Sequence, residues 1–221
     1  MRTVLVIAPH PDDETIGCGG TLLKYKAVGC RVYWLLVTSI SEAYGWSVEQ
    51  VACRRQEIEA VKKLYGFDGL YELNFPTTRL DTIPAAELVG AVNGVIQEVQ
   101  PDTVYLPNRS DVHSDHRVAF DAAWSSTKVF RCPFVERLLM YETLSETDFA
   151  PPIAEAAFVP NVFVDITDFY HGKEKALRVY ASEMIEGFSR SLPGIEKHHA
   201  VRGSRIGVSC AEAFMLLFEK R

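Results

Sequence analysis

The sequence predicts an α/β protein with a mostly parallel, Rossmann-like sheet and helices on both faces. Short runs at 3–7, 31–38, 69–75 and 102–107 are rich in β-branched and other apolar residues, as expected of strands buried on both faces. Segments with the apolar spacing of helices separate these runs, so strands and helices alternate through the first half of the chain. Later strand candidates are less regular, and we expect antiparallel additions to the sheet near the C-terminus.

Length and charge limit the classes of protein to consider. A chain of 221 residues with 48% hydrophobic content suits one compact domain, 1–221. Its 23 basic and 29 acidic residues give a net charge of −6 and no basic block longer than two residues, which argues against a nucleic-acid partner. No apolar run approaches the roughly 18 to 20 residues of a membrane span, and the N-terminus lacks a signal-peptide pattern. Five scattered cysteines without a Cys-x-x-Cys pair are typical of reduced core thiols, so we expect a cytoplasmic protein.

The loop after the first predicted strand carries an unusual concentration of metal-ligand side chains. One imidazole and three carboxylates lie within five residues, namely His10, Asp12, Asp13 and Glu14. Pro9 and Pro11 stiffen the same loop. Ligand sites in open α/β sheets lie at the carboxyl ends of the strands, so this loop is a candidate metal or acid/base site.

A glycine-rich segment begins the next predicted helix, 16–29. Gly17 and Gly19 fit the first two positions of a dinucleotide-binding fingerprint, but Leu22 stands where its third glycine is needed. We therefore expect these glycines, with Gly20, to let the helix pack close to the sheet.

The second strand leads through an aromatic loop into a long helix. Tyr44 and Trp46 in that loop suit either stacking on a substrate ring or packing onto the domain. Ser47 is a suitable cap for a helix at 48–65, which Gly66 ends. Arg54 and Glu57 lie at i,i+3 on this helix, a spacing more typical of a surface ion pair than of a substrate contact.

A second cluster of ligand residues follows the fourth strand. Pro84 opens a helix that runs to about residue 100, and the strand at 102–107 comes next. The loop leaving it contains Asp111, His113, Asp115 and His116 and runs into a helix at about 118–129. If both loops leave the same sheet edge, His113 and His116 come close to His10 and Asp13.

The remaining sequence is less informative. We expect strands at 137–141, 161–166 and 213–218, a helix near 169–184, and a long surface connection over 143–159. His171 and the pair His198-His199 have no companion carboxylate at ligand spacing, so we assign them no metal role.

The two loops together match the chemistry of a catalytic zinc site. Such a site takes three protein ligands and leaves one position for water, and His10, Asp13 and His116 supply that set. Asp12 is then free to act as the general base. His113, when protonated, suits stabilisation of an oxyanion or protonation of a leaving amine, and Asp115 suits a carboxylate partner that orients it.

The motifs resemble those of the PIG-L or LmbE-like family of zinc-dependent N-acetylsugar deacetylases. Pro9-His10-Pro11-Asp12-Asp13-Glu14 followed by Gly17-Cys18-Gly19-Gly20-Thr21 is the first match, and Asp111-x-His113-x-Asp115-His116 is the second. Weaker matches are Arg54-x-x-Glu57 with Ala60 and Leu64, Asp165-Ile166 with Lys173 and Ala176-Leu177, and Ala211-Glu212-Ala213-Phe214.

The resemblance implies a role for each matching residue. His10, Asp13 and His116 match the family's metal ligands, Asp12 its general base, and His113 its oxyanion-stabilising or acid histidine with Asp115 behind it. Arg54 matches an arginine that contacts substrate in some members. One departure is Asp111, since some thiol-biosynthetic members have a tyrosine there. The resemblance also implies a small N-acetylated sugar or conjugate as substrate and frequent assembly into homo-oligomers.

We therefore expect a Zn²⁺-dependent N-deacetylase that releases acetate and a free amine, with Fe²⁺ as another candidate metal. Three alternatives stay open from the residues. The first is an enzyme that cleaves a larger amide on a sugar conjugate. The second is an oxygenase whose iron is held by the two histidines and one carboxylate. The third is a non-catalytic sugar- or nucleotide-binding module that uses the glycine-rich turn.

Overall fold

The computed structural model describes residues 1–220 and contains one seven-stranded sheet with the strand order β3-β2-β1-β4-β5-β7-β6. Strands β1 to β5 are parallel, whereas β7 runs antiparallel to both of its neighbours, β5 and β6. This confirms the predicted mostly parallel sheet with antiparallel additions near the C-terminus. The strands are β1 (Thr3–Ala8), β2 (Arg31–Ser39), β3 (Gly69–Pro76), β4 (Thr103–Pro107), β5 (Arg137–Tyr141), β6 (Val162–Asp165) and β7 (Ala211–Glu219).

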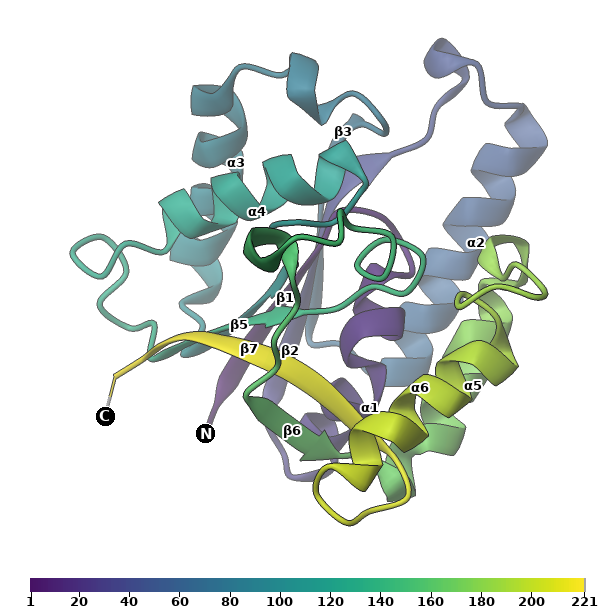
Figure 1. Cartoon of the computed structure of the whole chain (residues 1–221). Helices are drawn as coiled ribbons and strands as arrows, with labels where there is room; N and C mark the ends of the chain where they lie inside the picture. The colour runs from purple at the N-terminus through teal and green to yellow at the C-terminus, as the bar shows by residue number, and fades with distance from the viewer. Residues whose placement is uncertain (221) are drawn as a thin grey trace.

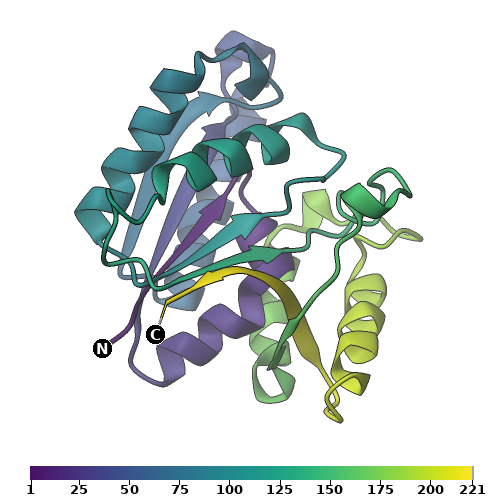
Figure 2. The ribbon, with the colours of Figure 1, turned by 60° about the vertical axis from the view of Figure 1, so that its left-hand side comes forward.

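Six α-helices among the described residues cover the sheet on both faces. Helices α3 and α4 lie on one face, and α1, α2 and α5 lie on the other, with α6 beside them (Figures 1 and 2). The helices are α1 (Asp13–Ala27), α2 (Val48–Tyr65), α3 (Ala85–Val99), α4 (Ser114–Ser126), α5 (Tyr170–Val179) and α6 (Leu192–Ser204). Short 3₁₀ helices lie at Glu42–Tyr44, Leu80–Thr82, Ala154–Ala156, Thr167–Phe169 and Ala181–Glu183.

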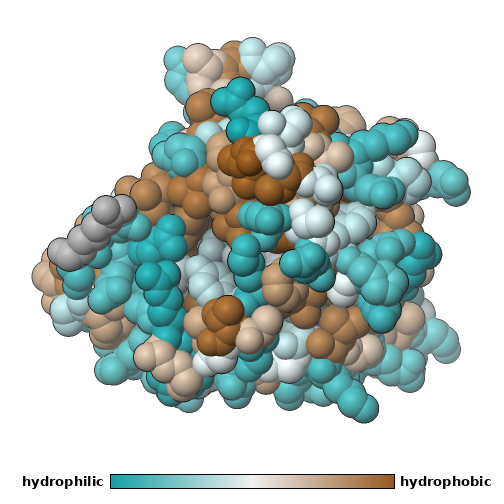
Figure 3. Space-filling view, turned by 90° about the horizontal axis from the view of Figure 1, so that it is seen from below, coloured by the Kyte–Doolittle hydropathy of each residue, from teal (hydrophilic) through white to brown (hydrophobic). Residues whose placement is uncertain are grey.

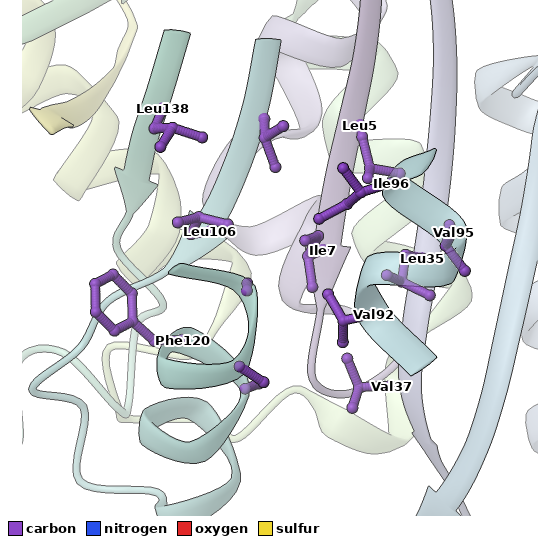
Figure 4. Packing of buried hydrophobic residues seen from close by; sticks show 14 of the residues in the cluster. Leu5, Ile7, Leu35, Val37, Val92, Val95, Ile96, Leu106, Phe120 and Leu138 are labelled. Carbon is purple, nitrogen blue, oxygen red and sulfur yellow. The ribbon is translucent and has the colours of Figure 1, made fainter. Parts of the chain in front are cut away.

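The alternation of side chains along β1 builds the two halves of the core. Leu5 and Ile7 point to the face covered by α3 and α4, where they meet Val92 and Ile96 (Figure 4). Val4, Val6 and Ala8 point to the opposite face and pack with residues of α1, α2 and α5. Because every residue of β1 is buried, the strand is a rigid support for the loop that follows it.

The strand order reverses at β1, and this reversal positions the site. The chain runs from β1 outward to β2 and β3, then returns to β4 on the other side of β1. The loops after β1 and β4 therefore leave neighbouring strands in opposite directions and open a crevice between them. This topological switch point is where ligands bind in open α/β sheets.

Two helices begin earlier than the sequence predicted, and both shifts affect the site. Helix α1 starts at Asp13 rather than Ile16, and α4 starts at Ser114 rather than at about Val118. The reason at α4 is an unusual cap, since the ring of His113 accepts the N–H of Asp115. Histidine is not among the preferred capping residues, so the residue pattern did not indicate this cap. As a result Asp13 and His116 lie in first helical turns.

The predictions for the C-terminal half were less accurate. Helix α6 was not predicted, although Ser191 caps it by accepting the N–H of Gly194, and Pro193 occupies its first turn. Glycine and polar residues interrupt the apolar spacing of this segment, so its sequence lacks the pattern that predicts a helix. The predicted surface connection over 143–159 was wrong at its start, because Thr143 and Leu144 are buried.

Gly17 confirms the expected close packing of α1 on the sheet. A Cβ at this position would lie 2.2 Å from Cδ2 of the Tyr141 ring, which is itself fixed by a hydrogen bond from its hydroxyl to the Ile7 carbonyl. We predict that Gly17→Ala lowers the free energy of unfolding by about 1–3 kcal/mol through overpacking. Urea denaturation followed by circular dichroism measures this, with Gly90→Ala, a helix glycine with open space around it, as the control. Equal stability of the Gly17→Ala variant and the wild type would contradict the packing argument.

Among residues 1–220 no helix is long and apolar enough to cross a membrane. On the face seen in Figure 3, apolar side chains lie in small groups among hydrophilic ones.

Candidate metal and catalytic site

Three side chains from the two loops converge at the switch point. Nδ1 of His10 lies 3.4 Å from Oδ2 of Asp13, and Nε2 of His116 lies 3.3 Å from each of these atoms. A tetrahedral zinc ion with protein ligands about 2.0–2.2 Å away separates its ligand atoms by about 3.3–3.5 Å. The spacing of the three atoms therefore fits a metal of this type without rearrangement.

The protonation of these residues also fits a cation site. Burial would raise the pKa of Asp13, but His116 and His10 lower it well below its usual value. Burial would lower the pKa of His116, yet Asp13 and Asp111 raise it to about 10. The carboxylate is therefore ionised, and the pocket between these groups favours a positive charge.

Each histidine of this trio has a carboxylate behind its other ring nitrogen. Nε2 of His10 lies 3.0 Å from Oδ2 of Asp115, and Nδ1 of His116 lies 2.8 Å from Oδ2 of Asp111. Such partners orient metal-binding imidazoles and raise their basicity. The remaining nitrogens, Nδ1 of His10 and Nε2 of His116, then both face Asp13.

The structure corrects the expected partner of Asp115. Its carboxylate contacts His10 and accepts the backbone N–H groups of Thr78 and Leu80, and only its backbone N–H reaches His113. Among the described residues no hydrogen bond joins its carboxylate to His113, whose Nδ1 already accepts the Asp115 N–H. The carboxylate therefore holds His10 and the 76–80 loop together.

Asp111 occupies the position at which some members of the family have a tyrosine. It is fully buried behind His116. Asn108 and Thr147 both donate to its other oxygen, Oδ1. We predict that Asp111→Asn weakens metal affinity about 10- to 100-fold, because the isosteric amide no longer polarises the imidazole. Competition with a chelator of known affinity measures this, and unchanged affinity would exclude the role.

Asp12 is not part of the trio but lines a cavity beside it. Its backbone has φ = 128°, a conformation rarely adopted by residues other than glycine, and this turn separates its side chain from that of Asp13. Burial raises the pKa of Asp12 to about 6, although Arg190 opposes the shift through an ion pair with Oδ2. The other oxygen, Oδ1, is buried and has no hydrogen-bond partner among the described residues. A poised, half-satisfied carboxylate of this kind is suited to accept a proton.

Glu14, the third acid of the motif, supports the loop from inside. Its Oε2 accepts the N–H of Asp12 at 3.1 Å, and Oε1 accepts the hydroxyl of Tyr180 at 3.2 Å. It is completely buried, and burial raises its pKa to about 8. Glu14 thus stabilises the strained turn at Asp12 rather than facing the cavity.

His113 lies beside the trio, with its ring centroid 4.5 Å from that of His10. Burial and the neighbouring His10 and His116 lower the pKa of His113 to about 4, so the neutral ring replaces the protonated one that we expected. Because Nδ1 accepts the Asp115 N–H, the proton of the neutral ring is on Nε2. His113 can therefore donate one hydrogen bond.

A cavity of about 170 Å³ lies over these groups. Its lining includes Asp12, His113, Trp46 and Arg54, so one aromatic of the 39–46 loop faces the cavity. Arg54 is not the surface ion pair that its spacing suggested. It is largely buried, contacts Glu57 and Glu183, and donates to the Pro11 carbonyl at 3.1 Å.

Arg190, Glu183 and Glu146 also line the cavity and were not identified from the sequence. They come from the C-terminal half, where the sequence pattern was weakest.

The other histidines have partners that the sequence did not reveal. His198 lies 2.8 Å from Glu142, and His199 lies 2.6 Å from the buried amine of Lys173, which also pairs with Glu212. Glu212 in turn accepts the N–H groups of Gly20 and Thr21, so this network fixes α1 to β7. Within residues 1–220, neither candidate metal-binding group includes these histidines.

Comparison with known proteins agrees with this geometry. Residues 5–127, more than half of the chain, match the PIG-L family, described as GlcNAc-PI de-N-acetylase. The chain belongs to the PIG-L family. A diacetylchitobiose deacetylase of Thermococcus kodakarensis is 30% identical over 193 residues, covering 84% of this chain and 72% of that protein.

Two solved structures extend the likeness over nearly the whole PIG-L chain. A conserved protein of Thermus thermophilus has 27% identity and a TM-score of 0.80, covering 100% of this chain and 97% of its own. The N,N'-diacetylchitobiose deacetylase of Pyrococcus horikoshii, complexed with an inhibitor, has 26% identity and a TM-score of 0.77, covering 98% and 84% respectively. The fold of this PIG-L member is thus shared along nearly its whole length.

Proposed function

We propose that this PIG-L protein is a zinc-dependent N-deacetylase that hydrolyses the acetamido group of an N-acetylated sugar or sugar conjugate. The observation that carries the proposal is that Asp12 lines the same cavity as His10 and His116, whose ligand atoms lie within 4.8 Å of each other and of that of Asp13. The site combines a metal-compatible trio with a separate carboxylate whose Oδ1 is free. Deacetylases among the relatives support the choice of reaction.

His10, Asp13 and His116 would hold the metal. A zinc ion there would lower the pKa of a bound water to about 7 and polarise the amide carbonyl. Oδ1 of Asp12 accepts a proton from the attacking water, and Nε2 of His113 donates a hydrogen bond to the carbonyl oxygen as it becomes negatively charged. The water oxygen bonds to the carbonyl carbon, the C–N bond breaks, and the proton on Asp12 passes to the amine nitrogen. Acetate and a free amine leave.

The size and lining of the cavity suit the proposed substrate. A volume of about 170 Å³ next to the trio, lined by Trp46 and by the charged groups of Arg54 and Glu183, suits an acetamido sugar with its ring toward the aromatic. A larger amide on a sugar conjugate is the second candidate, since the cavity is partly open to solvent.

Release of acetate from a panel of N-acetylated sugars and conjugates tests the proposal. Matched N-propionyl and N-butyryl compounds distinguish deacetylation from cleavage of larger amides. Activity should vanish after chelation and return with Zn²⁺. Return only with Fe²⁺ together with oxygen consumption would indicate an oxygenase. Binding of a sugar with no turnover in any metal would indicate a binding module.

The five cysteines are all unpaired. This supports the proposal that the protein works in a reducing compartment such as the cytoplasm.

A further inference from the structure

We infer that Arg190 is the positioning residue for Asp12, holding Oδ2 of its carboxylate and leaving the unpartnered Oδ1 as the oxygen that accepts the proton. This inference rests on the proposed function. Arg190 forms an ion pair with Oδ2 of Asp12, and both side chains line the cavity. The side chain of Asp12 is 1% exposed and that of Arg190 is 13% exposed, so the pair lies in surroundings where it is little screened by solvent.

The local fold delivers Arg190 to this place. It immediately precedes Ser191, which caps α6, so the start of that helix fixes the chain direction at Arg190. The loop before it is closed by a hydrogen bond from the N–H of Ile185 to the Arg190 carbonyl at 2.7 Å. Ser191 also donates its hydroxyl to the Phe188 carbonyl at 2.7 Å. These hydrogen bonds thus fix the backbone at Arg190, the last residue of the loop before α6.

A small apolar cluster joins the start of α6 to the start of α1, which follows Asp12. Ile195 of α6 packs with Ile16 of α1, together with Leu144 and Leu177, and all four are buried. Ile16 lies one helical turn after Asp12, and its N–H is donated to the Asp12 carbonyl at 2.8 Å. The cluster therefore packs the start of α6 against the start of α1. This packing sets the separation of Arg190 and Asp12.

The contacts of Asp12 divide its two oxygens between two tasks. Oδ2 is held by Arg190, while Oδ1 is buried without a partner in the described part of the chain. A carboxylate free to rotate would present either oxygen, or neither, to a water on the metal side. Loss of the fixed carboxylate orientation should slow the reaction, because a displacement of about 1 Å at a reacting group can reduce the rate about 10²-fold.

Arg190 is also held from its other side. Its Nη1 donates to the Ser145 hydroxyl at 3.4 Å and lies 3.8 Å from Glu146. These contacts come from the loop after β5 and keep the guanidinium plane fixed against Asp12. A planar guanidinium fixed at both ends orients a carboxylate better than a lysine amine does.

The test uses Arg190→Met and Arg190→Lys in the zinc-loaded full chain. We expect kcat of the Met variant to fall about 10²-fold, with KM and zinc content near those of the wild type. The Lys variant should recover part of this loss. Added guanidinium ion at non-denaturing concentration should raise kcat of the Met variant and leave the wild type unchanged.

The control is Arg178→Met, which removes an exposed arginine that pairs with Glu174 on the surface of α5. A crystal structure of Arg190→Met gives a readout that does not depend on turnover, since the Asp12 carboxylate should adopt a different or mixed orientation. An unmoved carboxylate with unchanged kcat would overturn the inference, and so would a rise in KM at constant kcat, which indicates a substrate contact. If the wild type deacetylates nothing while Asp12 moves in the variant, the proposed function fails and the positioning role stands.

Discussion

Asp12→Asn is expected to reduce kcat for acetate release about 10²- to 10⁴-fold while zinc content remains that of the wild type. The isosteric amide can still accept a hydrogen bond from Arg190, so the loop and the cavity keep their shape. What the variant lacks is a carboxylate oxygen able to take a proton at Oδ1. Since Asp12 lies outside the trio that would hold the metal, the loss should fall on kcat.

Steady-state acetate release and elemental analysis of the same preparation measure the two quantities. Asp121→Asn, at an exposed position of α4, is the matched control for removal of a carboxylate. Loss of zinc from the Asp12→Asn protein would show that the base and ligand roles are wrongly divided.

The parallel half of the fold was predictable because its signals are local. Buried strands read as apolar runs, and Ser47, Gly66 and Pro84 lie where helices begin or end. Two ligand-rich loops after two parallel strands were enough to predict that His10 and His116 would approach each other. The sequence could not specify that β4 lies directly beside β1, although the short distances in the trio depend on it.

The parts that escaped prediction depend on contacts between distant residues. Which ring nitrogen of His10 faces Asp115 is decided by side-chain rotamers in the folded crevice, so motif spacing assigned that carboxylate to His113 instead. Arg190 lies 178 positions after Asp12 and follows no motif. The packing of helix α6, which was not predicted, helps to bring it to the cavity.

Asp13→Asn is expected to produce the opposite result to Asp12→Asn, with zinc affinity reduced at least about 10²-fold and activity lost in consequence. Asp13 supplies the only carboxylate of the trio, and its Oδ2 lies 3.3–3.4 Å from the facing nitrogens of both histidines. An amide oxygen is neutral and binds zinc more weakly than a carboxylate oxygen. The same Oδ2 accepts the N–H of His10 at 2.8 Å, a bond that an amide oxygen preserves, so the effect on folding should be small.

Titration with Zn²⁺ against a competing chelator measures the affinity, and excess Zn²⁺ should restore part of the activity of Asp13→Asn but none of that of Asp12→Asn. This contrast separates the two adjacent residues, because mass action can refill a weakened metal site but cannot replace a missing base. Wild-type zinc affinity in the Asp13→Asn protein would exclude Asp13 as a ligand. The backbone at Asp12 explains why neighbours can differ so much, since its φ of 128° turns one carboxylate to Arg190 and the next to the two imidazoles.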